Sequence, residues 1–259
     1  TLGIVNAEGK RKWIRPKQPS GFFTRMRTIA SAGLLAFLFG VPFLSVDGHP
    51  FILFNVLERK FILFGAAFGP HDFYIFVLAM IAFIVFVILF TVVFGRLFCG
   101  WVCPQTVFME MVFRRIDYWL EGDHRAQKRL DAAPWSAGKW ARRLAKYAVY
   151  FCLSFIIGNT LLAWVIGIDE LVQIIVDPPS AHLAGLTAMF AFSALFYWIF
   201  IWFREQACIL VCPYGRLQGV LLDRNSIVIA YDHLRGEPRG KIRRGEERTL
   251  GDCIDCSAC

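Results

Sequence analysis

Four long stretches of this sequence contain no charged side chain, and they restrict the fold more than any other feature. They cover residues 28–46, 73–94, 147–168 and 183–203. An α-helix rises about 1.5 Å per residue, so roughly 20 apolar residues cross the hydrocarbon core of a bilayer. Each stretch has that length, and together they explain why 57% of the residues are hydrophobic. The pattern predicts an all-α membrane protein with four transmembrane helices.

The residues around the apolar stretches predict three regions. Residues 1–27 form a basic N-terminal arm, 28–225 form the membrane domain, and 226–259 form a linker and the start of an iron–sulfur domain. Residues 1–27 precede the first apolar stretch, and no small-residue cleavage site follows it. We therefore expect this stretch to be a retained helix and not a cleaved signal peptide.

The 28 lysines and arginines predict the orientation in the membrane. Residues 1–27 hold seven, 95–146 hold ten and the segment from 204 onward holds nine, whereas 169–182 hold none. Cytoplasmic loops carry an excess of positive charge. Both ends of the chain and the 95–146 loop are therefore predicted to be cytoplasmic. Because orientation explains the net charge of +8, we expect the lipid bilayer as a partner and no nucleic acid.

One cysteine motif occurs twice, each time after a pair of apolar stretches. Cys99 and Cys103 are followed by Pro104, and Cys208 and Cys212 are followed by Pro213. The recurrence predicts two parallel two-helix repeats, each ending in CxxxCP. Such repeats are related by an axis along the membrane normal. That axis would bring the four thiols to one depth, where they can face each other.

The residues around these cysteines indicate soft-metal or redox chemistry. A proline disfavours the α conformation before it and fits the first turn of a helix, so each second cysteine is expected to cap a new helix. The helix dipole, with Arg96 and Arg204 nearby, would favour thiolate. A reducing cytoplasm disfavours structural disulfides. Thiolates select Cu(I), zinc or iron–sulfur clusters. Buried cysteines without a ligand, and a disulfide-forming cycle, remain alternatives. Cys152, within the third helix, is expected to be a small packing residue.

The end of the sequence carries a more specific signal. Cys253, Cys256 and Cys259 follow the C-x2-C-x2-C spacing of the first three cluster ligands in bacterial ferredoxins. The run normally continues to a fourth cysteine, so the ligand set for a 4Fe-4S cluster is incomplete in this chain. Zinc is the competing reading, although paired CxxC units are its more usual ligands. We expect this chain to be the membrane part of a longer protein.

Several local predictions follow the same reasoning. The apolar runs at 51–54 and 61–64 fit a hairpin or an interfacial element, with a membrane-hugging loop as the preferred interpretation. Residues 105–121 are predicted to form an amphipathic helix whose polar face includes Arg114, Arg115 and Asp117. Asn159 and Thr160 are expected to hydrogen-bond a neighbouring helix. Residues 226–231 are predicted to form a strand.

Taken together, several segments resemble one family, the CcoG (also FixG or RdxA) proteins, which are cytochrome c oxidase accessory proteins of bacterial inner membranes. The resemblance covers the chain from Asp47 onward and rests on segments that occur in the family's order: Phe98–Thr106, Glu121–Asp123, Ala133–Trp135, Cys208–Tyr214, Tyr231–Asp232, Arg235–Gly240 and Gly251–Cys259.

The resemblance implies a protein of the bacterial inner membrane that helps assemble the cbb-type oxidase. It implies reduction of Cu(II) to Cu(I), with copper or redox roles for Cys99, Cys103, Cys208 and Cys212. It also implies 4Fe-4S ligation by Cys253, Cys256 and Cys259. The implied partners are the oxidase assembly machinery, copper chaperones and a cytoplasmic electron donor, and the oligomeric state, including a homo-oligomer, stays open.

Three functions are therefore weighed. The preferred one is a membrane cupric reductase that supplies Cu(I), and hence an oxidoreductase. The second is an electron-transfer subunit that holds an iron–sulfur cluster at the thiol tetrad, or a quinone in the bundle. The third is a copper chaperone or scaffold without redox activity. A transporter is disfavoured because the four apolar stretches carry no charges that could form an ion path.

Overall fold

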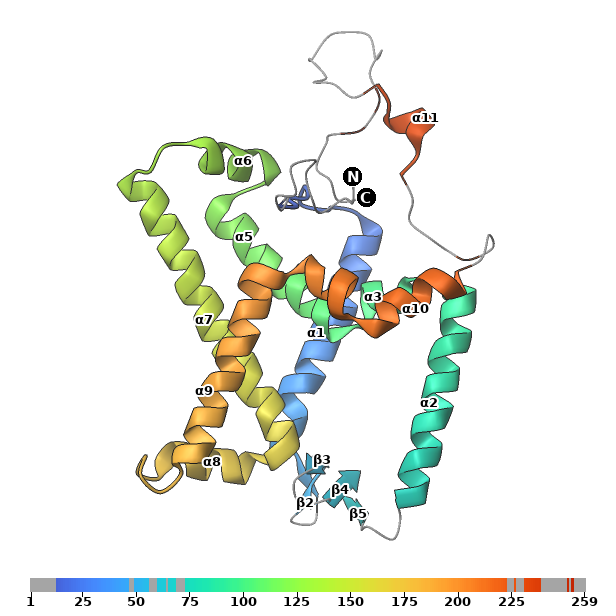
Figure 1. The fold of residues 1–259 in the computed structure, drawn as a ribbon, viewed down its shortest axis with the longest axis vertical. Helices are drawn as coiled ribbons and strands as arrows, with labels where there is room; N and C mark the ends of the chain where they lie inside the picture. The colour runs from blue at the N-terminus through green and yellow to red at the C-terminus, as the bar shows by residue number, and fades with distance from the viewer. Residues whose placement is uncertain are drawn as a thin grey trace.

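The computed structural model describes residues 13–46, 49–55, 60–63, 65–68, 73–222, 226, 231–238, 251 and 253 (Figure 1). Cys256 and Cys259 lie outside these residues, as does most of the strand predicted over 226–231.

Within the described residues, four helices are long and apolar enough to cross a membrane, which confirms the predicted spans. They are α1 (Phe22–Gly40), continued by the 3-10 helix η1 (Val41–Phe43), α2 (Phe73–Phe94), α7 (Ala137–Ile166), and α9 (Leu183–Trp198), continued by the π-helix η4 (Ile199–Phe203). Many apolar side chains of α2 are exposed, among them Leu78, Phe83 and Leu89, as expected for a helix surrounded by lipid.

Two of the long helices begin before their apolar stretches do. α1 starts at Phe22 and so includes Arg25 and Arg27 in its first turns. α7 starts at Ala137, where the backbone N–H of Lys139 donates to the Ser136 hydroxyl at 3.3 Å and caps the helix. Both helices therefore carry charged residues beyond their apolar spans, at the same end of the bundle (Figure 1).

The opposite end of the bundle is covered by two small sheets and a short helix (Figure 1). The strands are β1 (Ser45–Val46), β2 (His49–Pro50), β3 (Ile52–Asn55), β4 (Lys60–Leu63) and β5 (Ala66–Phe68), and the helix is α8 (Ile168–Val176). β3, β4 and β5 pair antiparallel, with Phe54 opposite Phe61. The preferred loop interpretation was wrong and the hairpin alternative is confirmed, because paired strands satisfy the backbone of these apolar runs. The fold is therefore mostly helical and not strictly all-α.

Short helices gather at the end where α2 and α9 finish (Figure 1). They are α3 (Leu97–Trp101), α4 (Pro104–Thr106), the π-helix η3 (Val107–Phe113), α5 (Arg114–Glu121), α6 (His124–Ala132), the π-helix η5 (Ala207–Val211), α10 (Pro213–Leu221) and α11 (His233–Gly236). Gly122, with a φ of 82°, ends α5. The main apolar core lies where η3 meets α7 and the end of α9, and the Phe113 and Phe200 rings stack there with centroids 4.4 Å apart.

The predicted helix over residues 105–121 is present, but two of the residues assigned to its polar face are buried. Arg114 and Asp117 are only 8% and 3% exposed, whereas Trp119 is 79% exposed. Arg114 and Asp117 point into the protein because they meet charges of opposite sign on Glu205 and Arg204, between η4 and η5, whereas Arg115 stays exposed. Paired charges tolerate burial that isolated charges do not.

Polar residues inside α7 also differ from expectation. Asn159 Nδ2 donates to the Phe155 carbonyl at 2.8 Å and Thr160 Oγ1 to the Ile156 carbonyl at 2.9 Å, so both bond within α7 and not across to a neighbour. Cys152 is exposed on the helix surface and does not pack in the bundle. Close approach of α7 and α9 instead uses Gly158, where a Cβ would lie 3.2 Å from the Ser193 hydroxyl.

The two pairs of long helices pack differently. α7 packs along α9, whereas the main contacts of α2 are with α3 and α10, and α2 stands apart from the crossing of α7 and α9 (Figure 1). The arrangement as two parallel repeats therefore remains a prediction.

Candidate functional site

Both CxxxCP motifs end in the same local structure. Cys103 and Cys212 have extended backbones, with ψ of 122° and 113°, and each directly precedes a helix that starts at the following proline. Proline fits a first helical turn because its missing N–H would have no partner there. The prediction that each second cysteine occupies the capping position is confirmed. The first cysteines lie in the preceding short helices, Cys99 in α3 and Cys208 in η5.

The four cysteines are gathered in one region. All four are half-buried and free. The Cys99 thiol interacts electrostatically with Cys103 and Cys212, and the Cys208 thiol with Cys103, Cys212 and Cys99. Motifs that lie far apart in the sequence thus meet at the end of the bundle where α3 and α10 lie (Figure 1).

Two of these thiols have raised pKa values, whereas the sequence predicted that they would be thiolates. Burial raises the pKa of Cys208 to about 11, and repulsion from the neighbouring cysteines and Glu205 adds to the shift. Burial also raises the pKa of Cys99, against the lowering effect of a hydrogen bond from Gln218 and of the Arg96 charge. Burial thus favours the neutral thiol at both positions, and at Cys99 it outweighs the nearby positive charge of Arg96.

The four thiols do not converge on one point. Within the described residues, no group of three or more His, Cys, Asp and Glu side chains is placed to hold a metal ion. The donor chemistry nevertheless fits a soft ion or an iron–sulfur cluster, since both are held by cysteine sulfur. The cysteines fit such a ligand by the type of their donor atom and by their common location.

Gln218 on α10 links the two motifs and was missed by the sequence reasoning. Its amide Nε2 donates to Cys99 Sγ at 3.1 Å, which joins the helix after the second motif to the first motif. Gln218 is only 2% exposed. Tyr214, also on α10, contacts the Phe98 ring edge to face, with centroids 5.9 Å apart. These contacts fix α10 against α3.

Gly215 allows the start of α10 to lie close to Cys208. A Cβ placed on Gly215 would lie 2.6 Å from the Cys208 carbonyl oxygen and 3.8 Å from Cys212 Cβ. Real Cβ atoms do not approach a backbone oxygen so closely. The turn from Cys208 to α10 therefore requires the absence of a side chain at this position.

Arg204 does not supply charge to the thiols, contrary to the prediction. Its guanidinium donates to Asp117 Oδ2 and to the Tyr150 hydroxyl, both at 2.7 Å, and to the Phe200 carbonyl at 3.2 Å. Its backbone has a φ of 44°, a left-handed conformation that costs a non-glycine residue roughly 1–3 kcal/mol. The buried partners of the side chain offset this cost and fix the point where the chain leaves η4 toward Cys208.

Asp117 is the centre of the buried ion network around Arg204. The Tyr150 hydroxyl donates to Asp117 Oδ1 at 2.8 Å, and Lys146 Nζ lies 2.8 Å from the same oxygen. Lys146 also pairs with Glu121 at 3.0 Å. Burial alone would raise the pKa of Asp117, but Arg204 and Lys146 hold it below its ordinary value. Asp117 and Glu121 are four residues apart in the sequence, as are Lys146 and Tyr150. This spacing places each pair on one face of its helix, and it was the sequence signal for the network.

A second ion cluster lies beside the Cys208 turn. Arg114 pairs with Glu110 on the same helical segment and with Glu205, which follows Arg204. Arg114 thus pairs with Glu205, and Asp117 pairs with Arg204. The helix after the first cysteine motif positions the segment before the second.

The C-terminal cysteines are described only in part. Cys253 is half-buried, and Cys256 and Cys259 lie outside the described residues. Their predicted role as cluster ligands remains a prediction.

Comparisons with known proteins identify two iron–sulfur segments. A family model for a 4Fe-4S binding domain matches residues 76–126, and one for a 4Fe-4S dicluster domain matches residues 203–259. The first segment contains Cys99 and Cys103, and the second contains Cys208, Cys212 and the C-terminal triplet. No solved structure matches the chain.

Three curated relatives match nearly the whole chain. Protein RdxA of Cereibacter sphaeroides is 35% identical over 95% of the chain and protein RdxB of that organism 33% over 96%. The nitrogen fixation protein FixG of Rhizobium meliloti is 32% identical over 96%. The chain spans about half the length of these relatives, namely 54% of RdxB, 52% of RdxA and 49% of FixG. With its four apolar helices and its two 4Fe-4S segments, this membrane protein belongs to the FixG/RdxA family.

Proposed function

We propose that this chain is the membrane part of an electron-transfer protein that reduces Cu(II) to Cu(I). The site is the group of Cys99, Cys103, Cys208 and Cys212. The observation that carries the proposal is the meeting of these four thiols at one end of the bundle. Family membership supports the electron-transfer part, because the chain matches two 4Fe-4S families.

The thiols would favour the product oxidation state of copper. Cysteine sulfur is a soft ligand that suits Cu(I), so Cu(II) held there accepts one electron readily. Because the pKa values of Cys99 and Cys208 are raised, copper binding there must release protons. When bound, 4Fe-4S clusters supply one-electron carriers, and Cys253, Cys256 and Cys259 would be three of the ligands. The electron comes from a reduced cytoplasmic donor.

The proposed setting is the bacterial inner membrane, with both ends of the chain in the cytoplasm. The charge distribution supports this orientation, since Arg15, Lys146 and Arg204 lie at the end of the thiol site and Asp169 and Glu170 lie on α8 at the other. The proposed recipients of Cu(I) are copper chaperones and the assembly machinery of the cbb-type oxidase, as the resemblance implies.

One observation favours a second function. The 4Fe-4S binding family matches residues 76–126, and Cys99 and Cys103 are the cysteines within that range. The thiol tetrad could therefore hold an iron–sulfur cluster itself, which would make the chain an electron-transfer subunit without a copper substrate.

The reductase function is tested by following Cu(I) formation with a Cu(I)-specific chelator. The full chain is used, with a chemical reductant as donor. We expect Cys99→Ser/Cys208→Ser to lose at least about tenfold in rate, because two of four sulfur ligands are removed. Cys152→Ser, which changes an exposed cysteine away from the site, should retain the full rate. An unchanged rate in the double variant would refute the proposal.

Gln218→Ala should weaken Cu(I) binding about tenfold without removing it. The amide orients Cys99 and partly offsets the effect of burial on its pKa, as groups that bond to a metal ligand commonly do. Competition with a Cu(I) chelator measures the affinity. Gln173→Ala, an exposed change on α8, serves as the control, and an equal effect in both variants would contradict this role for Gln218.

A further inference from the structure

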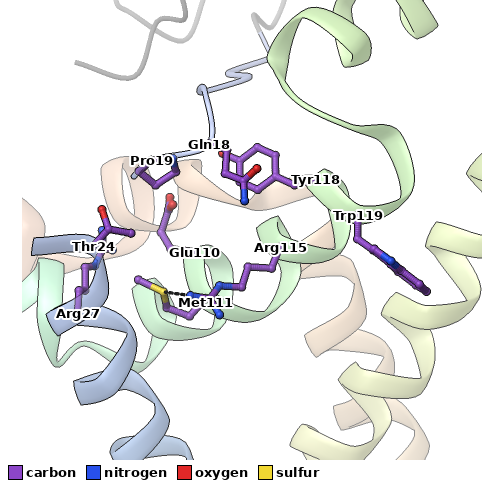
Figure 2. Close-up of a pocket in the computed structure, with 9 residues that line it drawn as sticks. All are labelled: Gln18, Pro19, Thr24, Arg27, Glu110, Met111, Arg115, Tyr118 and Trp119. Carbon is purple, nitrogen blue, oxygen red and sulfur yellow. Dashed lines mark hydrogen bonds between the residues drawn. The ribbon is translucent and has the colours of Figure 1, made fainter. Parts of the chain in front are cut away.

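A cavity of about 360 Å³ lies beside the first turns of α1, separate from the cysteines. Figure 2 shows Gln18 and Pro19, from the segment before α1, on one side and Glu110, Met111 and Arg115 on the other. The cavity is thus formed by the N-terminal segment, α1, η3 and α5.

The wall formed by the N-terminal segment is held in place. The Tyr118 hydroxyl donates to the Pro16 carbonyl at 3.2 Å, and the Gln18 backbone N–H donates to Asp123 Oδ1 at 3.0 Å. Arg15 also pairs with Asp131. These bonds fasten residues 15–18 to α5 and α6, so the cavity is a built feature of this end of the protein.

The cavity has an excess of positive charge. Arg27 and Arg115 line it, and among the described residues neither pairs with a carboxylate. Among the described residues, the groups to which Arg115 donates are neutral, namely the Thr28 hydroxyl at 2.7 Å and the sulfur of Met111 at 3.9 Å. Glu110 also lines the cavity, but its carboxylate is neutralised by Arg114.

The remaining lining adds hydrogen-bonding groups and no further negative charge. Gln18 and Thr24 contribute an amide and a hydroxyl. Burial raises the pKa of Tyr118 to about 12, so its hydroxyl stays neutral. Neutral donors beside two guanidinium groups suit a phosphate, which arginine binds through paired hydrogen bonds.

The cavity lies at the boundary of the membrane. The candidate span of α1 begins at Phe22, between the lining residues Pro19 and Thr24. Phe22 and Phe23 are exposed there, and so is Trp119 on the cavity wall. Exposed aromatic residues at a span end are typical of the level of lipid head groups.

We propose that this cavity binds the phosphate of an anionic phospholipid head group, held by Arg27 and Arg115. Basic pockets beside transmembrane helices bind such lipids. Phosphate is also present on soluble esters, but the position of the cavity at the start of a span favours a lipid. A lipid bound there would join the N-terminal segment, α1 and α5.

The test measures lipid binding to the full chain by native mass spectrometry in detergent. Phosphatidylglycerol is compared with phosphatidylcholine of the same acyl chains, and glycerol phosphate serves as a soluble competitor. The cavity variant is Arg27→Gln/Arg115→Gln. The matched control is Arg25→Gln/Arg125→Gln, which removes the same charge from exposed positions on α1 and α6.

We expect the cavity variant to bind phosphatidylglycerol about tenfold more weakly and the control to change less than about twofold. Phosphatidylcholine carries the same phosphate but no net charge, so it should bind the original protein more weakly than phosphatidylglycerol does, and the cavity variant should lose this preference. An equal loss in both variants would assign the effect to general surface charge and overturn the proposal. Full displacement of the lipid by glycerol phosphate would overturn the lipid assignment. Unfolding midpoints of all three proteins show whether a loss of binding reflects misfolding.

Discussion

Asp117→Asn is expected to destabilise the protein by about 3 kcal/mol or more, which is large for a single substitution. The change keeps the size of the side chain but removes the charge that faces Arg204 and Lys146. Arg204 would then be buried without the carboxylate that it pairs with, and its hydrogen bonds to the Tyr150 hydroxyl and the Phe200 carbonyl are to neutral groups. The midpoint of unfolding in SDS measures the loss.

The control for this prediction is Asp177→Asn. Asp177 pairs with His182 at 3.0 Å, but both side chains are largely exposed. Exposed pairs contribute less than about 1 kcal/mol, so this variant should unfold almost as the original protein does. Similar midpoints for Asp117→Asn and Asp177→Asn would contradict the central place of Asp117 in the network.

The effect of Asp117→Asn should also depend on pH. The folded pKa of Asp117 lies below its unfolded value, so the stability it contributes is fully present above the unfolded pKa. That contribution is lost as the pH falls through the folded pKa. The stability difference between the original protein and the variant should therefore be large at about pH 7 and shrink below about pH 4.

Gly215→Ala is the second large expected effect. The added methyl group would sit 2.6 Å from the Cys208 carbonyl oxygen, so either the turn around Cys208 or the start of α10 must move. A displacement of about 1 Å is enough to disrupt a site that depends on the mutual position of four thiols. We expect metal binding at the tetrad to fall at least about tenfold.

Gly219→Ala provides a matched control on the same helix. A Cβ at Gly219 meets nothing within 4 Å. Alanine favours a helix over glycine by roughly 0.8–1.0 kcal/mol, so this variant should bind metal normally and unfold no earlier. Normal metal binding by Gly215→Ala would show that the turn tolerates displacement.

The sequence predicted the spans and the local structure of the cysteine motifs well. Uncharged apolar length is a direct physical requirement for crossing lipid, so all four spans could be located. The proline after Cys103 and Cys212 restricts the backbone locally, so the capping positions could also be predicted.

The buried charges could not be predicted from periodicity. A hydrophobic pattern assigns Arg114 and Asp117 to the outside, because it does not contain the distant residues Glu205 and Arg204 that neutralise them. For the same reason Arg204 was predicted to act on the thiols, although its partners are Asp117 and Tyr150. The thiol pKa values were missed because burial outweighs a nearby charge and is not visible in sequence spacing.

The proposed copper site consists of cysteines from both CxxxCP motifs, namely Cys99, Cys103, Cys208 and Cys212. Copper, iron and acid-labile sulfide are measured in the full chain, purified anaerobically and loaded with copper, beside Cys99→Ser/Cys208→Ser. We expect copper without sulfide at the four cysteines, and loss of this copper in the variant. Iron with sulfide that disappears in the variant would contradict the copper site and identify the tetrad as an iron–sulfur site.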